Sequence, residues 1–224
     1  SVERSEWDEA CQLIAEIDPM GNRTEYAYDD RGNRVRITRP DGVTLETEYN
    51  ALNLPVRLVD GNGQHWQQEW DEQGLLVRQL TPLGAERRYA YDMRGQLIAF
   101  TDELGHTTRL QPDARGFVSA VTDPLGHVTR YELDAFGNVL QATDPIGRST
   151  QYAYDERHRL TRIRRPSGAE VRCAYDPEDN LIEYRDEENR VTRLEYTGQG
   201  EVACRKQPDG HTVRYHYDAE ERLI

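Results

Sequence analysis

Apolar and polar residues alternate along this chain in short runs of about five to seven residues, bounded by Gly, Pro, Asp or Asn. One kind of run is rich in aliphatic and β-branched residues, as in 97–101. The other kind, as in 24–28, places Thr, Tyr and Tyr at every second position, so that these side chains share one face of an extended chain. Runs of this length are too short for helices, and the pattern therefore predicts β-strands throughout.

An internal repeat of 21 residues runs through the whole chain without a change of phase. Each unit is marked by an aromatic residue followed by a small polar one: Trp7-Asp8, Tyr28-Asp29, Tyr49-Asn50, Trp70-Asp71, Tyr91-Asp92, Tyr154-Asp155, Tyr175-Asp176, Tyr196-Thr197 and Tyr217-Asp218. The units at Pro112-Asp113 and Leu133-Asp134 keep the aspartate and lose the aromatic ring. A chain that is repetitive throughout builds a surface or a wall from stacked units.

Two turns are predicted in every unit. Fourteen residues after each aromatic position comes a glycine, often in the order Asp-Pro-x-Gly, as in 144–147, with Asn189 as the one replacement. Proline presets φ, aspartate bonds the backbone ahead of it, and glycine accepts a positive φ. A second turn follows the aromatic residue directly, as in 29–32. The structural repeat positions that we single out are Tyr28, Asp29, Gly32, Gly42, Tyr91, Asp92, Gly95, Gly105, Tyr154, Asp155, Tyr175, Asp176, Tyr217 and Asp218.

Strands joined by tight turns form β-hairpins, and hairpins in series form an antiparallel meander. We therefore expect an all-β fold in which each 21-residue repeat forms a hairpin, giving roughly 21 strands. Residues 1–224 are expected to be a single repeat region of about ten and a half units, taken from a longer chain. Because open twisted sheets rarely exceed about ten strands without curling, the ribbon should coil into a spiral or wrap round a space.

Twelve of the thirteen tyrosines fall on the two aromatic registers of the repeat, and Tyr184 is the exception. This regularity predicts a ladder of tyrosine rings stacked from strand to strand. Aromatic pairs between strands each contribute a few tenths to about 1 kcal/mol.

Composition alone would favour disorder, since only 36% of residues are hydrophobic and the net charge is −13. The periodicity overrides this and favours a single-layer sheet without a thick core. The basic residues are almost all arginine, and several recur beside the apolar strand positions: Arg36, Arg57, Arg78 and Arg162. We expect them to pair with acids on neighbouring strands, namely Glu48, Glu69, Glu132 and Glu195. The acidic net charge argues against nucleic-acid binding.

No residue is singled out as catalytic, cofactor-binding or metal-binding. His106, His127 and His211 follow the turn glycine, so they are one repeat position seen three times and are expected to be surface residues. The three cysteines occupy three different positions without a Cys-x-x-Cys pair, which favours free thiols in a reducing compartment. The acidic runs 176–179 and 186–188 lack the order of a calcium loop, and no signal peptide or long apolar run occurs.

The unit Tyr-Asp-x-x-Gly-x-Leu, then Asp-Pro-x-Gly, then x-Thr-x-Tyr-x-Tyr resembles the tyrosine-aspartate (YD) repeat of the Rhs (rearrangement hotspot) family of polymorphic toxin proteins. Segments 91–98 and 129–139 match it closely, and the resemblance covers essentially the whole chain. Relatives of that family include the C component of insecticidal toxin complexes, wall-associated bacterial toxins and teneurins. The amino-acid sequence of the repeats is most similar to that of Rhs cores of Gram-negative bacteria.

The resemblance implies a β-strip that forms a hollow cocoon around a C-terminal toxin domain. It further implies synthesis in the bacterial cytoplasm, signal-independent export, often by a type VI secretion system, and use in interbacterial competition. The partners implied are other repeats and plug segments of the same shell, the enclosed toxin, and secretion spike or chaperone proteins, with no nucleic acid and no membrane span. The family's self-cleaving aspartyl protease segment has no counterpart here, because the Asp-Pro-x-Gly turns recur as hairpin turns without the Leu of the cleavage motif.

The expected function is therefore a non-enzymatic wall segment of a toxin-encapsulating shell. The alternative is an extended surface of tyrosine and arginine that binds carbohydrate or protein in adhesion. A shell predicts an unrelated domain downstream of a protease segment, whereas an adhesin predicts a signal peptide or a membrane anchor.

Overall fold

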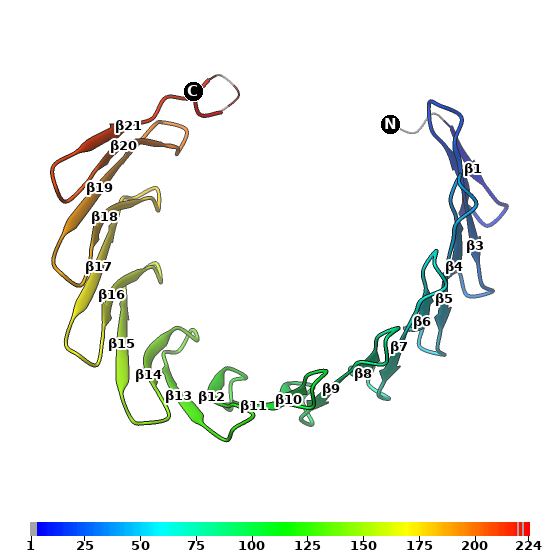
Figure 1. Cartoon of the computed structure of the whole chain (residues 1–224), viewed down its shortest axis with the longest axis horizontal. Helices are drawn as coiled ribbons and strands as arrows, with labels where there is room; N and C mark the ends of the chain where they lie inside the picture. Colours follow the sequence, from blue (N-terminus) through cyan, green and yellow to red (C-terminus); the bar gives the residue numbers. More distant parts are fainter. Residues whose placement is uncertain (1–3, 219, 221) are drawn as a thin grey trace. The chain divides into compact units, whose positions relative to one another are not determined.

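The computed structural model describes residues 4–218, 220 and 222–224, and its strands follow one another along a ribbon of hairpins (Figure 1). The strands are β1 (Arg4–Trp7), β2 (Leu13–Ile17), β3 (Arg23–Tyr28), β4 (Arg34–Thr38), β5 (Thr44–Tyr49), β6 (Pro55–Val59), β7 (His65–Trp70), β8 (Leu76–Leu80), β9 (Glu86–Tyr91), β10 (Leu97–Thr101), β11 (Thr107–Pro112), β12 (Val118–Thr122), β13 (Val128–Leu133), β14 (Val139–Thr143), β15 (Ser149–Tyr154), β16 (Leu160–Arg164), β17 (Glu170–Tyr175), β18 (Leu181–Arg185), β19 (Val191–Tyr196), β20 (Val202–Lys206) and β21 (Thr212–Arg214).

These 21 strands belong to one sheet, and no helix occurs in the described residues. The chain divides into two compact units, 1–110 and 111–224. In the first unit each strand pairs antiparallel with the next one along the chain, as β3 does with β4 and β4 with β5. The second unit repeats this order, as in β15 with β16 and β16 with β17. The expected all-β antiparallel meander of hairpins is confirmed.

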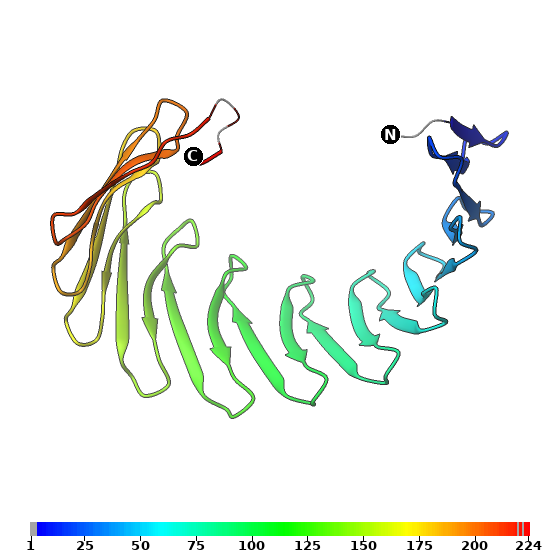
Figure 2. The same ribbon diagram turned by 45° about the horizontal axis from the view of Figure 1, so that its top comes forward.

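The two turns of each unit lie at opposite edges of the ribbon. Figure 2 shows this alternation for residues 111–175, where successive strands stand side by side. We name the edge formed by the turns that follow the aromatic positions, such as 29–33, the tyrosine-turn edge. The edge formed by the other turns, such as 39–43, is the proline-turn edge. Both kinds of turn close with the same backbone bonds, from the first N–H to the fifth carbonyl and from the fourth N–H to the first carbonyl.

The fourth residue of each turn up to 207–211 adopts the left-handed conformation, with φ of 85° at Gly32 and 83° at Gly105. A type I turn followed by one left-handed residue is the usual way to close a three-residue hairpin loop. The replacement Asn189 keeps this geometry, with φ of 67°. Position in the repeat therefore determines the backbone conformation, and glycine is the residue that adopts it with least strain.

One β-bulge per repeat makes the odd period compatible with a two-faced sheet. In the β3–β4 hairpin, Tyr28 pairs with Arg34 whereas Ala27 pairs with Arg36, so that Val35 is an extra residue. The β4–β5 hairpin at the other edge is regular. Side chains alternate between faces, so without the extra residue a 21-residue period would move the tyrosines to the opposite face in every second unit. The bulge keeps them on one side.

The two faces of the sheet differ in chemistry. The ring face carries the tyrosines and most aliphatic strand residues, such as Tyr26 and its partner Ile37. The charge face carries glutamates and arginines, such as Glu46 and its partner Arg36. The apolar residues that are buried are few and small: Ala15, Ala120, Val171 and Cys204. The layer therefore has no thick core, as the composition predicts.

Ala15 shows how a residue is buried in a single layer. It is fully covered although it lies on the charge face, where its cross-strand partners are Glu6 and Glu25. The guanidinium of Arg23 bridges these two carboxylates at 2.8 and 2.9 Å. Cys204 occupies the same repeat position and is also buried. Long charged side chains thus cover the short ones between them.

The predicted ladder of stacked tyrosine rings is wrong. The tyrosines of the two repeat registers lie on every second strand, and the strand between carries mainly aliphatic residues on this face, so Tyr26 opposes Ile37 and Tyr152 opposes Ile163. Equivalent tyrosines of successive repeats are consequently two strands apart, about 9.6 Å at ordinary strand spacing. Among the described residues, the close ring pairs are Tyr89 with Phe100 and Phe136 with His158.

Substitution of Gly105 by Ala is expected to destabilise the chain by about 1–2 kcal/mol, because an L-residue is strained at its φ of 83°. A Cβ at this position would meet no other atom within 4 Å, so the effect isolates backbone strain. Thermal or urea unfolding of the variant measures it.

Gly198→Ala is the matched control. A Cβ there also meets nothing within 4 Å, but the backbone of Gly198 lies outside the left-handed region. Its stability should stay unchanged or rise slightly. Equal losses in the two variants would show that loss of flexibility, and not left-handed strain, is responsible.

Candidate functional site

The tyrosine turn is built around the carboxylate of its first residue. Oδ1 of Asp29 accepts hydrogen bonds from the backbone N–H groups of Arg31 and Asn33, both at 2.9 Å. Oδ2 accepts a bond from Nδ2 of Asn33 at 2.9 Å. The bond from Asn33, followed by the backbone bonds, holds the pKa of Asp29 below its ordinary value. One short side chain thereby fixes all five residues of the turn.

The other singled-out aspartates have the same role in the structure. Each accepts bonds from the backbone N–H groups two and four residues ahead: Asp92, Asp155, Asp176 and Asp218. The glycines that we singled out all have positive φ: Gly32, Gly42, Gly95 and Gly105. These positions therefore lie in turns at both edges of the ribbon, and they do not gather into one site.

The aromatic residue before each aspartate ties one hairpin to the hairpin before it. The hydroxyl of Tyr175 donates to the backbone carbonyl of Leu160, 15 residues earlier, at 3.0 Å. The same bond recurs at the same spacing for Tyr28, Tyr49, Tyr91, Tyr154, Tyr196 and Tyr217. Trp70 uses its indole N–H for the carbonyl of Pro55, at 2.7 Å. We call this recurring bond the tyrosine clasp.

The clasp closes a gap between strands. Pairing of β16 with β17 ends at Arg162 and Arg172, before the tyrosine-turn edge is reached. Leu160 and Tyr175 lie beyond the last pair, and the tyrosine hydroxyl donates to the carbonyl there. A half-buried carbonyl needs such a donor. Burial raises the pKa of Tyr175, which keeps its hydroxyl a donor.

Two units have no clasp of this kind, because Pro112 and Leu133 carry no side-chain donor. The sequence shows their lost aromatic rings but not what those rings do. A signal was present in the sequence, since every aromatic position stands 15 residues after a strand start. The splayed hairpin ends that give this spacing its meaning are visible only in the structure.

A second set of contacts joins successive turns along the tyrosine-turn edge. Arg31 donates to the carbonyl of Asn50 at 2.6 Å, and Arg115 donates to the carbonyl of Asp134 at 2.5 Å. Both pairs are 19 residues apart and link one turn to the next. Sequence reasoning missed this role of turn arginines.

Two of the expected arginine–glutamate pairs form on the charge face, and Arg36 pairs instead with Glu46 at 2.8 Å. Arg57 pairs with Glu48 at 2.7 Å and Arg78 with Glu69 at 2.6 Å. Lys206 takes the place of arginine opposite Glu195, at 2.9 Å. Glu132 contacts Gln141 and not an arginine. Exposed pairs of this kind contribute roughly 0–1 kcal/mol each, so the charge face adds solubility and register more than stability.

The histidines and cysteines lie as the repeat predicts. His106 and His127 contact the carboxylates of Asp102 and Asp123 within their own turns, at 3.3 and 2.9 Å. All three cysteines are free thiols: Cys11, Cys173 and Cys204. Among the described residues no group of three His, Cys, Asp or Glu side chains could hold a metal ion. The same residues contain no helix that could cross a membrane.

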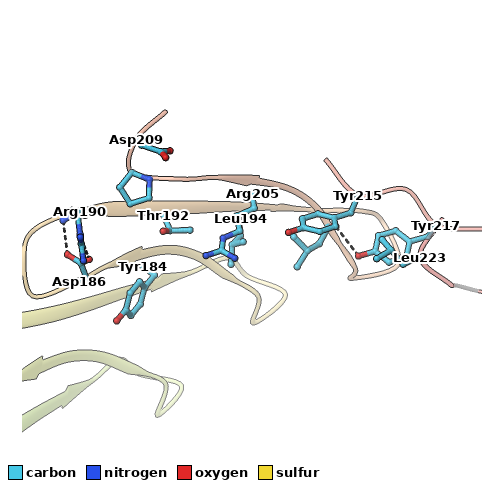
Figure 3. A pocket seen from close by; sticks show the side chains of 12 residues that line it. Tyr184, Asp186, Arg190, Thr192, Leu194, Arg205, Asp209, Tyr215, Tyr217 and Leu223 are labelled. Atoms are coloured by element: carbon cyan, nitrogen blue, oxygen red, sulfur yellow. Dashed lines mark hydrogen bonds and ion pairs between the residues drawn. The ribbon is translucent and has the colours of Figure 1, made fainter. Parts of the chain in front are cut away.

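A shallow recess of about 1030 Å³ lies on the ring face of the second unit (Figure 3). Its walls include the rings of Tyr184 and Tyr215 and the side chain of Leu194. Two polar groups at its rim, Arg190 and Asp186, form an ion pair at 2.7 Å. The hydroxyl of Tyr217 is engaged in its clasp with Val202. These groups stabilise the sheet and form no nucleophile–base pair.

Tyr175→Phe removes one clasp donor and keeps the ring. Because the carbonyl of Leu160 then loses its partner, stability should fall by about 1 kcal/mol. Urea unfolding measures the loss. Tyr184→Phe is the control, because the Tyr184 hydroxyl donates to no backbone carbonyl in the described part of the chain, and it should change little.

Leu133→Tyr is the reciprocal variant, since it restores a donor 15 residues after Val118. It should be more stable than Leu133→Phe, which adds the ring alone, by a similar amount. Identical stabilities for these two variants would show that ring burial, and not the hydrogen bond, explains the recurrence of tyrosine.

Asp29→Asn is expected to be less stable than wild type at neutral pH and to lose this deficit in acid. Because the pKa of Asp29 is lowered in the folded chain, its carboxylate contributes stability above about pH 4, and this contribution is lost as the pH falls through the folded pKa. Unfolding midpoints between pH 7 and pH 2.5 test it. Asp30→Asn is the matched control, because this side chain lies beside Asp29 but outside the hydrogen bonds of the turn, and it should not show the deficit at neutral pH.

The RHS Repeat family model matches residues 7–44, 70–99, 91–128, 113–145 and 134–170, which together exceed half of the chain. No curated protein matches the sequence. Among solved structures, the chain is similar to "Crystal Structure of TcdB2-TccC3-TEV", with a TM-score of 0.73 and 18% identity over 99% of this chain and 14% of the other.

A second similar structure is "Structure of Photorhabdus luminescens Tc holotoxin pore, Mutation TccC3-D651A", with a TM-score of 0.62 and 15% identity over 98% of this chain. This chain spans only 14% and 15% of the lengths of these two relatives. At such identities the likeness shows the fold. The family model covers more than half of the chain and establishes that this chain belongs to the RHS repeat family.

Proposed function

We propose that this chain is a non-catalytic wall segment of a shell that encloses a toxin domain. The observation that carries the proposal is the architecture itself: one layer of hairpins in which every repeat repeats the turns, bulge and pairing of its neighbours. Such a layer gains length by adding units and has no interior of its own to hold an active site. Similarity of fold to chains of Tc toxin complexes supports this assignment.

The energetics of the repeat suit a wall. Each unit is stabilised by strand pairing with adjacent units, and most units add a clasp, as in a linear repeat protein. Many charges of the charge face are paired, the clasp tyrosines are bonded to the backbone, and the described residues contain no group of side chains that could hold a metal ion. A continuous hydrogen-bonded layer excludes proteases and other macromolecules from one of its sides.

The finer parts of the proposal concern the whole protein. We place residues 1–224 as one repeat region within a longer chain, coiled round a space that holds a C-terminal toxin. Its partners are other repeats and plug segments of the same shell, the toxin, and secretion spike or chaperone proteins. The protein is made in the bacterial cytoplasm and exported by a signal-independent system, such as type VI secretion, against competing cells.

Limited proteolysis of the full-length protein tests enclosure. We expect the segment C-terminal to the repeats to resist protease in the native protein and to be digested once the repeats are denatured, as followed by mass spectrometry. A surface variant such as Arg57→Gln should leave this protection unchanged. Equal rates of cleavage in native and denatured protein would contradict enclosure and favour an extended binding surface.

A further inference from the structure

Several left-handed turn positions carry a residue other than glycine, and three of them share one contact. Asn53, His158 and Asp179 have φ of 60°, 62° and 71° at the fourth position of their tyrosine turns. Each is bonded by a side chain 20 residues earlier, which lies in the preceding tyrosine turn: Asn33 to Asn53 at 2.9 Å, Asn138 to His158 at 3.0 Å, and Arg159 to Asp179 at 2.7 Å. A strained residue is therefore used where its side chain joins two repeats.

We propose that the bond between Asn138 and His158 is an acid-sensitive joint between successive repeats. The Asn33–Asn53 contact and the Arg159–Asp179 contact are its counterparts without an imidazole. The three contacts have the same place in the repeat. The two that lack an imidazole are therefore references against which the pH response of the Asn138–His158 contact can be measured.

The geometry determines which atoms donate. Nδ2 of Asn138 lies 2.8 Å from Oδ2 of Asp134 and 3.0 Å from Nδ1 of His158. Asp134 already accepts the backbone N–H groups of Phe136 and Asn138 and is held as a carboxylate, with its pKa lowered by the bond from Asn138. A carboxylate only accepts, so the amide must present its N–H₂ group to it. The second hydrogen of this group then points to His158, whose Nδ1 must be unprotonated.

Protonation of the imidazole removes this acceptor, because both ring nitrogens then carry hydrogen. A half-turn of the Asn138 amide does not solve this, because its oxygen would then replace Nδ2 beside the Asp134 carboxylate, where two acceptors would face each other. The joint thus contributes stability while the imidazole is neutral and is lost when acid protonates it. Imidazole side chains ordinarily titrate between about pH 7.5 and 5.5.

Aromatic and charged groups from two turns surround the ring. The Phe136 ring lies over the imidazole, with centroids 4.2 Å apart. The acidic groups that face it are Asp134, from the preceding turn, and Asp155 and Glu156, from its own turn. The cations of its own turn are Arg157 and Arg159, and both are paired with Asp179 of the following turn.

The experiment is nitrogen–proton correlation NMR of the histidine rings, with His158 assigned by comparison with His158→Asn. At pH 7.5 we expect Nδ1 of His158 to be the unprotonated nitrogen, with the proton on Nε2. The opposite tautomer would overturn the proposal. This measurement is made on the wild-type chain and does not depend on the folding of any variant.

Hydrogen exchange provides the second readout. Protection of the backbone N–H groups in turn 134–138, corrected for intrinsic rates, should fall by roughly three- to tenfold between pH 7.5 and 5.5. Protection in turn 29–33, joined through Asn33 and Asn53, should stay constant. His158→Asn copies that reference contact and should remove the pH dependence. A fall of equal size in both turns, no fall, or a fall that persists in His158→Asn would contradict the proposal.

Discussion

Backbone hydrogen bonding between neighbouring strands is the interaction on which the rest of this structure depends. A single layer has no interior in which to bury large apolar side chains, and the few buried residues are small. Stability must therefore come from pairing each strand with the next and from keeping that pairing in register over many units. The turns, the bulge and the hydrogen bonds between repeats all maintain this register.

The aspartate turn and the tyrosine clasp solve different parts of the same problem. The aspartate fixes five residues with one carboxylate, so the chain reverses direction in the same way at every unit. Reversal at both edges leaves hairpins that separate near the tyrosine turns, as at the end of the β16–β17 pairing. The tyrosine hydroxyl supplies the donor that the carbonyl at the separated end would otherwise lack. The indole N–H of Trp70 can supply this donor as well, whereas a leucine side chain supplies none.

The use of the recurring side chains within the layer bears on function. The side chains that recur most regularly are used to hold the layer together, and their polar atoms are bonded within it. The two surfaces that the layer presents are the charge face and the ring face. Both extend along the strands without interruption, and such surfaces suit a wall better than a site for a small molecule. Departures from the repeat, such as His158, are the places where a wall of this kind acquires a property that its neighbouring units lack.

The amino-acid sequence by itself determined the strands, both turns, the hairpin order and the chemistry of the charge face. These features follow from local rules, because alternation at every second position and turn residues such as Asp29 and Gly32 act over a few neighbouring residues. Ion pairs such as Arg57 with Glu48 were predictable for the same reason, since hairpin partners are close in the chain.

Only the tertiary structure decided which side-chain atoms meet between hairpins. The tyrosines of successive units are two strands apart and do not stack, and their hydroxyls instead reach a carbonyl 15 residues earlier. The joint of Asn138 with His158 likewise depends on how two turns lie against each other. Such contacts are set by the bulge, by the splay of the strands and by the twist between them, and a linear pattern of residue types does not contain these quantities.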